Sequence, residues 1–397
     1  MRVWGRCPQR VQGRALALPS FLVTEPLRLL AAASPGEIRV ALVRGASLLG
    51  YAIERPGAPD GVGDVHRGRI AARRPALGGS FVALDGEAQG FLPDSEGASG
   101  LAEGVLLGVR VVRAAQAGKG PRLTARLDAD QAAASAEGKA RRVARGPGAL
   151  ERMALAYPGA AIETDDAALA AAARGLRASG LAVVARVFPG ALEAEIDGLG
   201  EPGVALPGGL VASIHPTPAL VAIDVDSGTA SNARTPKPAA QREANRAALP
   251  ALVRQMVLRN LSGAILVDMA GMAAKKRAAL GPELAQALRA DPLGARLLGF
   301  TALGLAEIVR ARVHPPLHEV LAGPHAAGLL ALRTVARAVA AEPGPARALR
   351  AAPDVVVALQ ADPVALDDLA RRSGRALILR SDPALGPGGW AMEVAGG

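Results

Sequence analysis

Hydrophobic and polar residues alternate with the two-residue period of β-strands through the first third of the chain. Residues 36–55 alternate around a Gly-Ala break, which predicts a hairpin. Five short β-like segments, punctuated by glycine, follow between residues 59 and 128: GVGDVHRGRIAAR, GGSFVALD, EAQGFLPDSE, LLGVRVVRAAQ and PRLTARL. Five short strands over about 70 residues favour a small barrel over a sandwich.

Longer apolar runs and helical patterns alternate in the second half of the chain. The runs at 219–228 and 263–272 predict buried strands that end in acidic residues, with a helix at about 240–260 between them. This strand–helix–strand order predicts an α/β layer. Helices are also expected at about 275–290 and 303–313.

The last part of the chain, residues 323–397, predicts a helix, a VVVAL strand, a second helix and an ALILR strand, which together would form a small α/β domain. At the other end, an apolar stretch after four arginines is interrupted by Pro19 and makes a poor signal peptide. We therefore expect residues 1–35 to be a disordered extension.

The composition excludes several classes of protein. Half of the 397 residues are apolar and 21% are charged, which is typical of a globular protein. No stretch approaches the ~18–20 uninterrupted apolar residues of a membrane span. A single cysteine, Cys7, excludes a disulfide framework and a zinc site built from the cysteines of one chain. A reducing, cytoplasmic location is therefore expected.

The charge indicates a polyanionic partner. Lysine and arginine number 46 against 36 acidic residues, which gives a net charge of +10. Arginine dominates and suits contact with phosphate, although a GC-rich genome would produce the same arginine share. No basic amphipathic helix with aromatic anchors appears, so nucleic acid is favoured over a membrane surface.

Carboxylates lie at the ends of the two buried strands. Asp224 and Asp226 end the first strand and Asp268 ends the second. A right-handed crossover would make the strands parallel and bring these side chains to one edge of a sheet. Clustered carboxylates repel one another unless a cation lies between them, and hard oxygens beside a phosphate suit Mg²⁺. The alternative reading is ordinary strand-end acids that cap helices.

Aromatic residues are scarce, so the pair in the barrel segments is informative. Phe81 and Phe91 are two of five phenylalanines and fall on adjacent strand-like segments. Aromatic side chains on the strands of an OB-fold stack on unpaired bases, at ~1–3 kcal/mol per base. Lys119 and Arg122 lie in the nearby GKGPRL segment. The alternative is that both phenylalanines belong to the core.

Taken together, these segments resemble the ribonuclease E/G family over residues 36 to 322. The motifs that carry the resemblance are VHRGRI, GGSFVALDGEAQGFLP, AGKGPRLTARL, LPGGLVASIHPTPALVAIDVDSG, EANRAALPALVRQMVLRNLSGAILVDMAGM and LLGFTALGLAEIVRARVHPPLHEVL. The resemblance implies a multidomain α/β (α+β) protein. In it, an OB-fold RNA-binding β-barrel is followed by a deoxyribonuclease-like α/β catalytic domain and a small C-terminal α/β domain.

The domain boundaries follow from that comparison. We expect the extension at 1–35, a hairpin at 36–58 packed with 181–203 as a reduced nuclease-H-like subdomain, the OB-fold at 59–128, a reduced 5′-sensor-like region at 129–180, the catalytic domain at 204–322 and the C-terminal domain at 323–397.

The resemblance also implies roles for individual residues. Asp224 and Asp268 match the two aspartates that bind the catalytic Mg²⁺, and Asp226 occupies the neighbouring position, usually Asn, so we include it in the catalytic set. The residues assigned to RNA contact are Phe81, Phe91, Lys119, Arg122, Arg254 and Arg259, of which the last two hold the family spacing ahead of the second acidic strand.

Several departures from the family pattern limit this reading. The paired cysteines of the zinc-link are absent, so we expect Mg²⁺ and no zinc, and any homo-oligomer would form without that link. The family's Arg-Thr sensor of a 5′-monophosphate corresponds to Glu163-Thr164, where a carboxylate would repel phosphate. Pro218 and Gly271 replace acidic residues close to the aspartates.

Two functions stay open at this stage. The first is a Mg²⁺-dependent endoribonuclease that cleaves single-stranded RNA and leaves 5′-phosphate and 3′-hydroxyl ends, as in the family. The second is a non-catalytic RNA-binding protein on the same fold. The presence of both Asp224 and Asp268 favours the enzyme.

Overall fold

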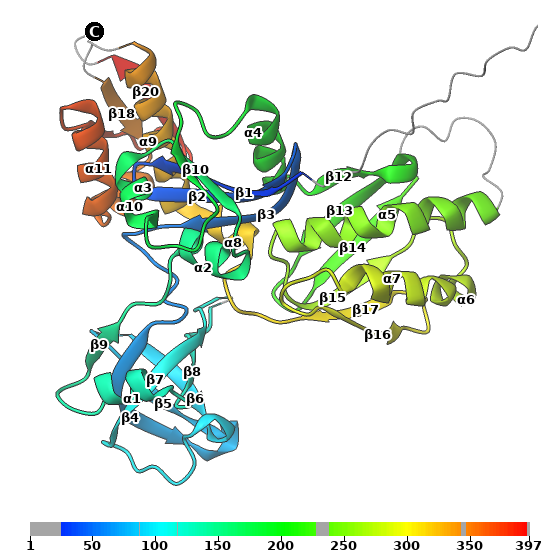
Figure 1. Cartoon of the computed structure of the whole chain (residues 1–397), viewed down its shortest axis with the longest axis horizontal. Helices are drawn as coiled ribbons and strands as arrows, with labels where there is room; N and C mark the ends of the chain where they lie inside the picture. The colour runs from blue at the N-terminus through cyan, green and yellow to red at the C-terminus, as the bar shows by residue number, and fades with distance from the viewer. Residues whose placement is uncertain (1–24, 87, 117, 228–237, 343–346, 395–397) are drawn as a thin grey trace, which may run out of the picture.

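The computed structural model describes residues 25–86, 88–116, 118–227, 238–342 and 347–394. Within them the chain forms four β-sheets with helices packed against three of them, which confirms the expected mixed α/β class (Figure 1). No helix in the described part of the chain is both long enough and apolar enough to cross a membrane. Between the first acidic strand and its crossover helix, residues 228–237 lie outside the described residues.

The first sheet has the strand order β11-β10-β1-β2-β3. Its antiparallel part consists of β1 (Leu27–Ser34), β2 (Glu37–Arg44) and β3 (Ser47–Glu54), while β10 (Ala161–Thr164) and β11 (Leu181–Val183) run parallel to β1. Helices α2 (Ala149–Ala156) and α3 (Ala167–Ala173) cover one face, and α4 (Gly190–Asp197) packs against the other.

One expected boundary differs from this sheet. Residues 27–34, expected in a disordered extension, form the central strand, because Leu29 and Ala31 face one core and Leu30 and Ala32 face the other. Residues 161–164, within the expected sensor-like region, pair with that strand. A strand buried on both faces reads as a continuous apolar run, which is why it lacked the alternation used to find strands.

The second sheet closes into a barrel. Its ring runs β4 (Val65–Arg74), β5 (Gly79–Ala83), β6 (Gln89–Pro93), β8 (Arg122–Thr124), β7 (Leu106–Arg113) and back to β4, and β9 (Arg141–Ala144) adds to β4. All five predicted β segments therefore form strands. The interior holds fully buried aliphatic side chains: Ile70, Val82, Leu92, Val109 and Leu123. Alternate residues on the same strands point outward.

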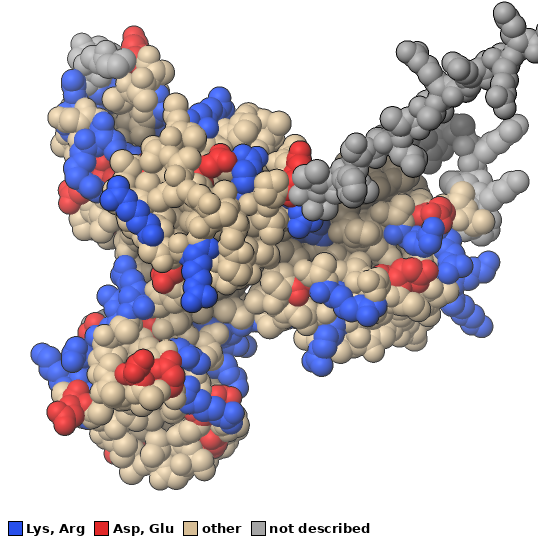
Figure 2. Space-filling view, viewed as in Figure 1, with Lys and Arg blue, Asp and Glu red and all other residues tan. Residues whose placement is uncertain are grey.

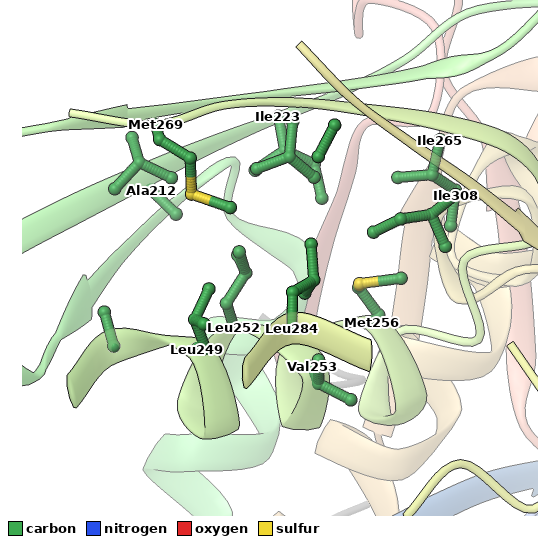
Figure 3. Close-up of a cluster of buried hydrophobic side chains, with 14 of the residues drawn as sticks. Ala212, Ile223, Leu249, Leu252, Val253, Met256, Ile265, Met269, Leu284 and Ile308 are labelled. Carbon is green, nitrogen blue, oxygen red and sulfur yellow. The ribbon is translucent and has the colours of Figure 1, made fainter. Parts of the chain in front are cut away.

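The third sheet carries the acidic strands. Its order is β12 (Gly203–Leu206), β13 (Leu210–Pro216), β14 (Val221–Asp226), β15 (Gly263–Asp268), β17 (Ala306–Arg310) and β16 (Arg296–Phe300). The crossover helix α5 (Pro238–Leu258) makes β14 and β15 parallel, as predicted. Figure 3 shows Leu249, Leu252 and Met256 of α5, with Leu284 of α7 (Gly281–Leu288), packed against Ile223 and Ile265 of the sheet.

The helix predicted at 303–313 is instead strand β17. Ala306, Ile308 and Arg310 are buried while Glu307 and Val309 are partly exposed, which is the two-residue period of a strand. The segment pairs with β15 along five residues. The helical reading failed because a short apolar run does not separate strand from buried helix.

The C-terminal unit consists of α9 (Gly323–Ala341), α10 (Pro353–Gln360) and α11 (Pro363–Ser373) on a sheet ordered β19 (Ile378–Ser381), β18 (Arg347–Ala351) and β20 (Trp390–Val394). The VVVAL segment, predicted as a strand, lies inside α10. Pro353 occupies the first helical position and Asp354 lies in the first turn, and both features favour a helix start.

The barrel meets the third sheet through a short contact. The backbone N–H of Ala114 donates to the carbonyl of Val313 at 2.8 Å, and Asp60 in the linker before the barrel lies 2.6 Å from the imidazole of His314. A cavity of about 660 Å³ lies at this junction, lined by linker, α2 and third-sheet residues. None of the three candidate catalytic aspartates lines it.

Candidate functional site

The predicted carboxylate edge forms on the third sheet. Asp224 of β14 is the direct register partner of Asp268 of β15, and Asp226 follows two residues later on the same face of β14. The hydrophobic neighbours Ile223, Val225 and Val267 point into the core beneath α5 and α7, so the carboxylates lie on the face that the helices leave open. Adjacent strands are ~4.8 Å apart, which brings Asp224 and Asp268 side by side.

Partial burial and the neighbouring carboxylates raise the pKa of Asp224. Partial burial, the negative charges of Asp226 and Asp268 and a hydrogen bond with Asp226 together raise the pKa of Asp224 above its ordinary value of 3.8. His215 on the neighbouring strand β13 opposes this effect. A carboxylate whose ionised form is destabilised by like charges is a good place for a cation.

This electrostatic strain predicts that Asp224→Asn stabilises the metal-free fold. A carboxyl group whose pKa is higher in the folded chain than in the unfolded chain favours folding at low pH and opposes it once the pH exceeds both values. The variant should therefore melt at a higher temperature than wild type at pH 7 in EDTA. That advantage should shrink as the pH is lowered through the titration of Asp224, measured by thermal denaturation at stepped pH.

Glu243→Gln is the matched control for that experiment. Glu243 is an exposed carboxylate on α5 whose pKa is lowered by its hydrogen bond with Arg246, so removing its charge should not raise the melting temperature. A lower melting temperature for Asp224→Asn than for wild type at pH 7 would contradict the repulsion inferred here.

Two residues that the sequence did not single out position Asp268 and the loop after it. Arg277 of α6 (Ala274–Arg277) forms an ion pair with Asp268 and donates from Nε to the carbonyl of Met272 at 2.8 Å. Asn245 of α5 is buried; it donates to the carbonyl of Ala270 at 2.9 Å and accepts from the N–H of Ala270 at 3.1 Å. Asn245 lies in the polar EANR segment, and nothing in that sequence indicates that its side chain is buried.

The two departures from the family pattern, Pro218 and Gly271, do not disturb the pairing of Asp224 with Asp268. Gly271 has a left-handed φ of 58°, and a Cβ there would meet the amide of Gln241 on α5, so an acidic side chain does not fit this conformation. Pro218 lies in the turn before β14, at the opposite end of that strand from Asp224 and Asp226.

The carboxylate edge offers few ligands, which suits Mg²⁺ with part of its water shell retained. Among the described residues, no group of three or more His, Cys, Asp or Glu side chains is arranged to hold a metal ion. A cation here would therefore rest on two carboxylates, Asp224 and Asp268. Mg²⁺ is commonly held by one or two carboxylates, with waters and substrate phosphates completing its shell, so the residues fit that ion.

A second candidate surface is a row of side chains across the outside of the barrel. Phe81 of β5 pairs in register with Phe91 of β6, Phe91 with Arg122 of β8, and Arg122 with Arg113 of β7. The two rings meet edge to face, with centroids 5.6 Å apart and an interplanar angle of 67°. Both are only partly buried and neither belongs to the barrel core, which disfavours the core-only reading.

The cationic end of this row points toward the third sheet. Arg113 is the register partner of Arg122, and its neighbour Ala114 is hydrogen-bonded to Val313, the residue after Arg312. Burial and the positive charges of Arg122 and Arg312 lower the pKa of Arg113. Lys119 is exposed in the turn between β7 and β8. Figure 2 shows lysine and arginine side chains over the barrel and again near the end of the third sheet where α6 lies. Aromatic rings beside cationic side chains suit single-stranded nucleic acid.

Arg254 and Arg259, assigned above to RNA contact, both form hydrogen bonds within the chain. Arg254 donates to the carbonyl of Leu48 and to Glu195, each at 2.5 Å, and so ties α5 to β3 and α4. Arg259 is 6% exposed and donates to the carbonyls of Glu201 and Gly198 and to the side chain of Gln255. The spacing that marks the family at 254–259 therefore joins the third sheet to the first.

We predict that Arg259→Met destabilises the fold without a direct effect on RNA binding. The change leaves the carbonyls of Glu201 and Gly198 without their donor, and a buried unpaired acceptor costs about 1–3 kcal/mol. Urea denaturation should show the loss, whereas Arg246→Met, which removes an exposed arginine from α5, should show none comparable. A stable Arg259→Met variant with weakened RNA binding would restore the original assignment.

At the apparent sensor position, the Glu163 side chain already has a partner within the chain. Glu163 lies on β10 and accepts from Arg28 of β1 at 2.9 Å, and its neighbour Thr164 is fully buried. Within the described residues, neither side chain of this pair offers a free donor to a terminal phosphate.

Comparisons with known proteins converge on the third sheet. Residues 188–313 match the model of the Ribonuclease E/G family. Proteins named Ribonuclease E are 34% identical to the chain over 121 residues in Nostoc sp. and 33% over 129 residues in Synechocystis sp., in each case 18% of the relative's length and 30% and 31% of this chain. The Escherichia coli protein of that name is 31% identical over 129 residues, 12% of its length and 32% of this chain.

The chain thus matches less than a fifth of each relative's length. The segment that matches the Ribonuclease E/G family model, residues 188–313, contains both acidic strands and their crossover helix, and it is over this segment that the chain is similar to that family.

Proposed function

We propose that the protein is a Mg²⁺-dependent endoribonuclease that cleaves single-stranded RNA to 5′-phosphate and 3′-hydroxyl ends. The observation that carries this proposal is the register pairing of Asp224 with Asp268 on an open sheet face, inside the segment that matches the family. The ribonuclease name of the relatives, which this chain matches in part, agrees with it.

Each group at the carboxylate edge has a distinct part in this proposal. Asp224 and Asp268 would hold Mg²⁺, which when bound lowers the pKa of a water and stabilises charge on the phosphate. Arg277 orients Asp268 through their ion pair. Asp226 lies two residues from Asp224 on the same face of β14, so it would lie beside the reacting phosphate.

The barrel row supplies the RNA-binding part of the proposal. The ring β4-β5-β6-β8-β7, with a parallel β6–β8 pair closing it, supports assignment as an OB-fold. Phe81 and Phe91 would stack on bases, while Lys119 and Arg122 contact phosphates. Arg113 extends the row toward Arg312, beside Gly263 at the start of β15. Asp268 lies at the other end of β15, and at ~3.3 Å per residue it is roughly 16 Å from Gly263.

Other features of the proposal follow the family. We assign the third sheet and its helices to a deoxyribonuclease-like catalytic domain and the first sheet to a reduced nuclease-H-like subdomain. A homo-oligomer would form without a zinc-link, and the site of action would be the cytoplasm.

We expect the purified protein to contain no stoichiometric zinc, because the chain has no cysteine beyond Cys7. His325, one of two imidazoles near the corresponding position, lies 2.9 Å from Asp362. Metal analysis by mass spectrometry should find well under one zinc per chain, and a chelator should not change the oligomeric state. One zinc per chain after gel filtration would contradict this expectation.

The test of the proposed function is an end-labelled, AU-rich single-stranded RNA incubated with the protein in Mg²⁺ and in EDTA. We expect internal cleavage in Mg²⁺ only, with products that a 5′-phosphate-dependent exonuclease degrades. Binding of the RNA without cleavage in either Mg²⁺ or Mn²⁺ would instead support a non-catalytic RNA-binding protein.

A further inference from the structure

A cavity far along the chain from the carboxylate edge lies between the first sheet and the C-terminal unit. It has a volume of about 560 Å³, and β1, β2, the segment before α4, α9 and α11 form its wall. Its lining is unusually rich in one side chain: Arg39, Arg186, Arg333, Arg337 and Arg372 all face it. The proposed nuclease function assigns no role to any of them.

Five arginines line the cavity but only two carboxylates, Asp165 and Glu193, do so. Arg372 is paired outside the lining, with Asp166 and Asp368. Glu193 alone pairs with three arginines: Arg39 at 3.3 Å, Arg186 at 3.6 Å and Arg337. Although burial acts to raise the pKa of Glu193, hydrogen bonds and charges from Arg337 and Arg39 lower it. Each of these arginines therefore receives only a share of one carboxylate.

The same imbalance recurs at the neighbouring carboxylate. Glu37, buried at 6% exposure, pairs with Arg333 at 3.1 Å and with Arg55 at 3.3 Å. The other carboxylate in the wall, Asp165, accepts from the backbone N–H of Ala33 at 2.9 Å. Glu37 and Glu193 together thus serve five arginines.

Two of the buried guanidinium groups have unused donors. Arg39 is 4% exposed, and its guanidinium carbon lies 5.0 Å from the ring centroid of Phe188. Among the described residues, neither Nε of Arg39 nor Nε of Arg333 has a hydrogen-bond partner, although both atoms are buried. Buried donors are almost always paired, so two in one wall point to a missing acceptor.

The remainder of the wall is apolar and small. Small apolar residues of β1, of the segment before α4 and of α9 form much of the remaining lining: Ala32, Ala33, Ala185, Val187, Ala336 and Ala340. Inorganic phosphate alone would fill little of this volume, which lies in the range of pockets for organic ligands. The cavity therefore combines an arginine end for an anion with an uncharged part for the group that carries it.

We propose that this cavity binds the phosphate group of a small organic phosphate monoester. A phosphate dianion accepts several charge-assisted hydrogen bonds, and guanidinium groups match its geometry. The ligand would join β2 and α4 to α9, so it would also fix the C-terminal unit against the first sheet. This inference is independent of the proposed nuclease function, because it uses none of the residues of the carboxylate edge or the barrel row.

The test is calorimetric titration of the whole protein, in metal-free buffer, with adenosine 5′-monophosphate, inorganic phosphate and adenosine. We expect one saturable site per chain for the monoester, weaker binding of phosphate and none of adenosine. Arg186→Gln combined with Arg337→Gln should weaken binding at least tenfold. Both side chains are more than half exposed, so the double variant should fold.

Two controls separate this site from other arginines. Arg371→Gln changes an exposed arginine of α11 that does not line the cavity, and Arg122→Gln removes a cation from the barrel row; both should bind the monoester within twofold of wild type. The proposal is overturned if the monoester shows no saturable binding or if the double variant binds as wild type does. Equal affinity for inorganic phosphate and the monoester would overturn the organic part of the assignment.

Discussion

Replacing Asp268 by asparagine is expected to reduce RNA cleavage in Mg²⁺ by more than a hundredfold. Asp268 and Asp224 are the two carboxylates that would hold the cation, and asparagine removes a charge with little change in shape. Loss of an outer-shell partner of a metal site typically costs ~10–100-fold in metal affinity or activity, so loss of a direct ligand should cost more. Single-turnover cleavage rates of a labelled single-stranded RNA measure the effect.

The control for this variant makes the same change in net charge at a position away from the carboxylate edge. Glu243→Gln removes one negative charge from an exposed position of α5 and should cleave at the wild-type rate. RNA affinity and melting temperature of Asp268→Asn should stay close to those of wild type. If wild type cleaves and Asp224→Asn and Asp268→Asn both cleave equally well, the carboxylate edge is not the catalytic centre.

Phe91→Ala is expected to weaken binding of single-stranded RNA by ~1–3 kcal/mol, or about 5–150-fold, with Phe81→Ala in the same range. The reason is that each ring is partly exposed on the outer face of the barrel, next to Arg122 in the strand register. Fluorescence anisotropy with a labelled oligonucleotide at fixed salt measures the change.

Leu77→Ala is the matched control, since Leu77 is a 61% exposed apolar residue of the same barrel outside the row. It should leave RNA affinity unchanged. If a Phe→Ala variant instead melts far below wild type while its folded fraction binds RNA normally, that ring is a core residue. A complex whose affinity does not fall with salt would argue against phosphate contacts by Lys119 and Arg122.

The carboxylate edge was predictable because its parts are local. An apolar run closed by an acid marks each strand end, and the handedness of a crossover connection dictates that the two ends meet. The register pairing of Asp224 with Asp268 confirms that reasoning. The barrel strands were predictable for a similar reason, since glycine turns and alternation identify each hairpin within a few residues.

The central strand β1 was missed because its environment is not local. Only one of its two partners, β2, is close in sequence; the other, β10, lies more than a hundred residues later, beyond the whole barrel. The roles of Arg254 and Arg259 were missed for the same reason. An arginine that caps backbone carbonyls of another unit looks in sequence like an arginine that binds phosphate, and only the positions of Leu48 and Gly198 tell them apart.

The contribution of Arg277 could not be read from sequence either. It lies in a run of basic residues, Lys275 to Arg277, that is typical of a solvated helix face. In the structure it is instead the cation that pairs with Asp268. An ion pair across a loop depends on how the loop turns, and here the left-handed Gly271 and the buried Asn245 set that turn.

The central claim, that Asp224 and Asp268 together hold one divalent cation, can be tested directly by titrating the RNA-free protein with Mn²⁺ and counting bound ions by electron paramagnetic resonance. The account predicts one Mn²⁺ per wild-type chain, displaced by excess Mg²⁺, and loss of that ion in both Asp224→Asn and Asp268→Asn. Retention of the same bound Mn²⁺ in the two variants would contradict it.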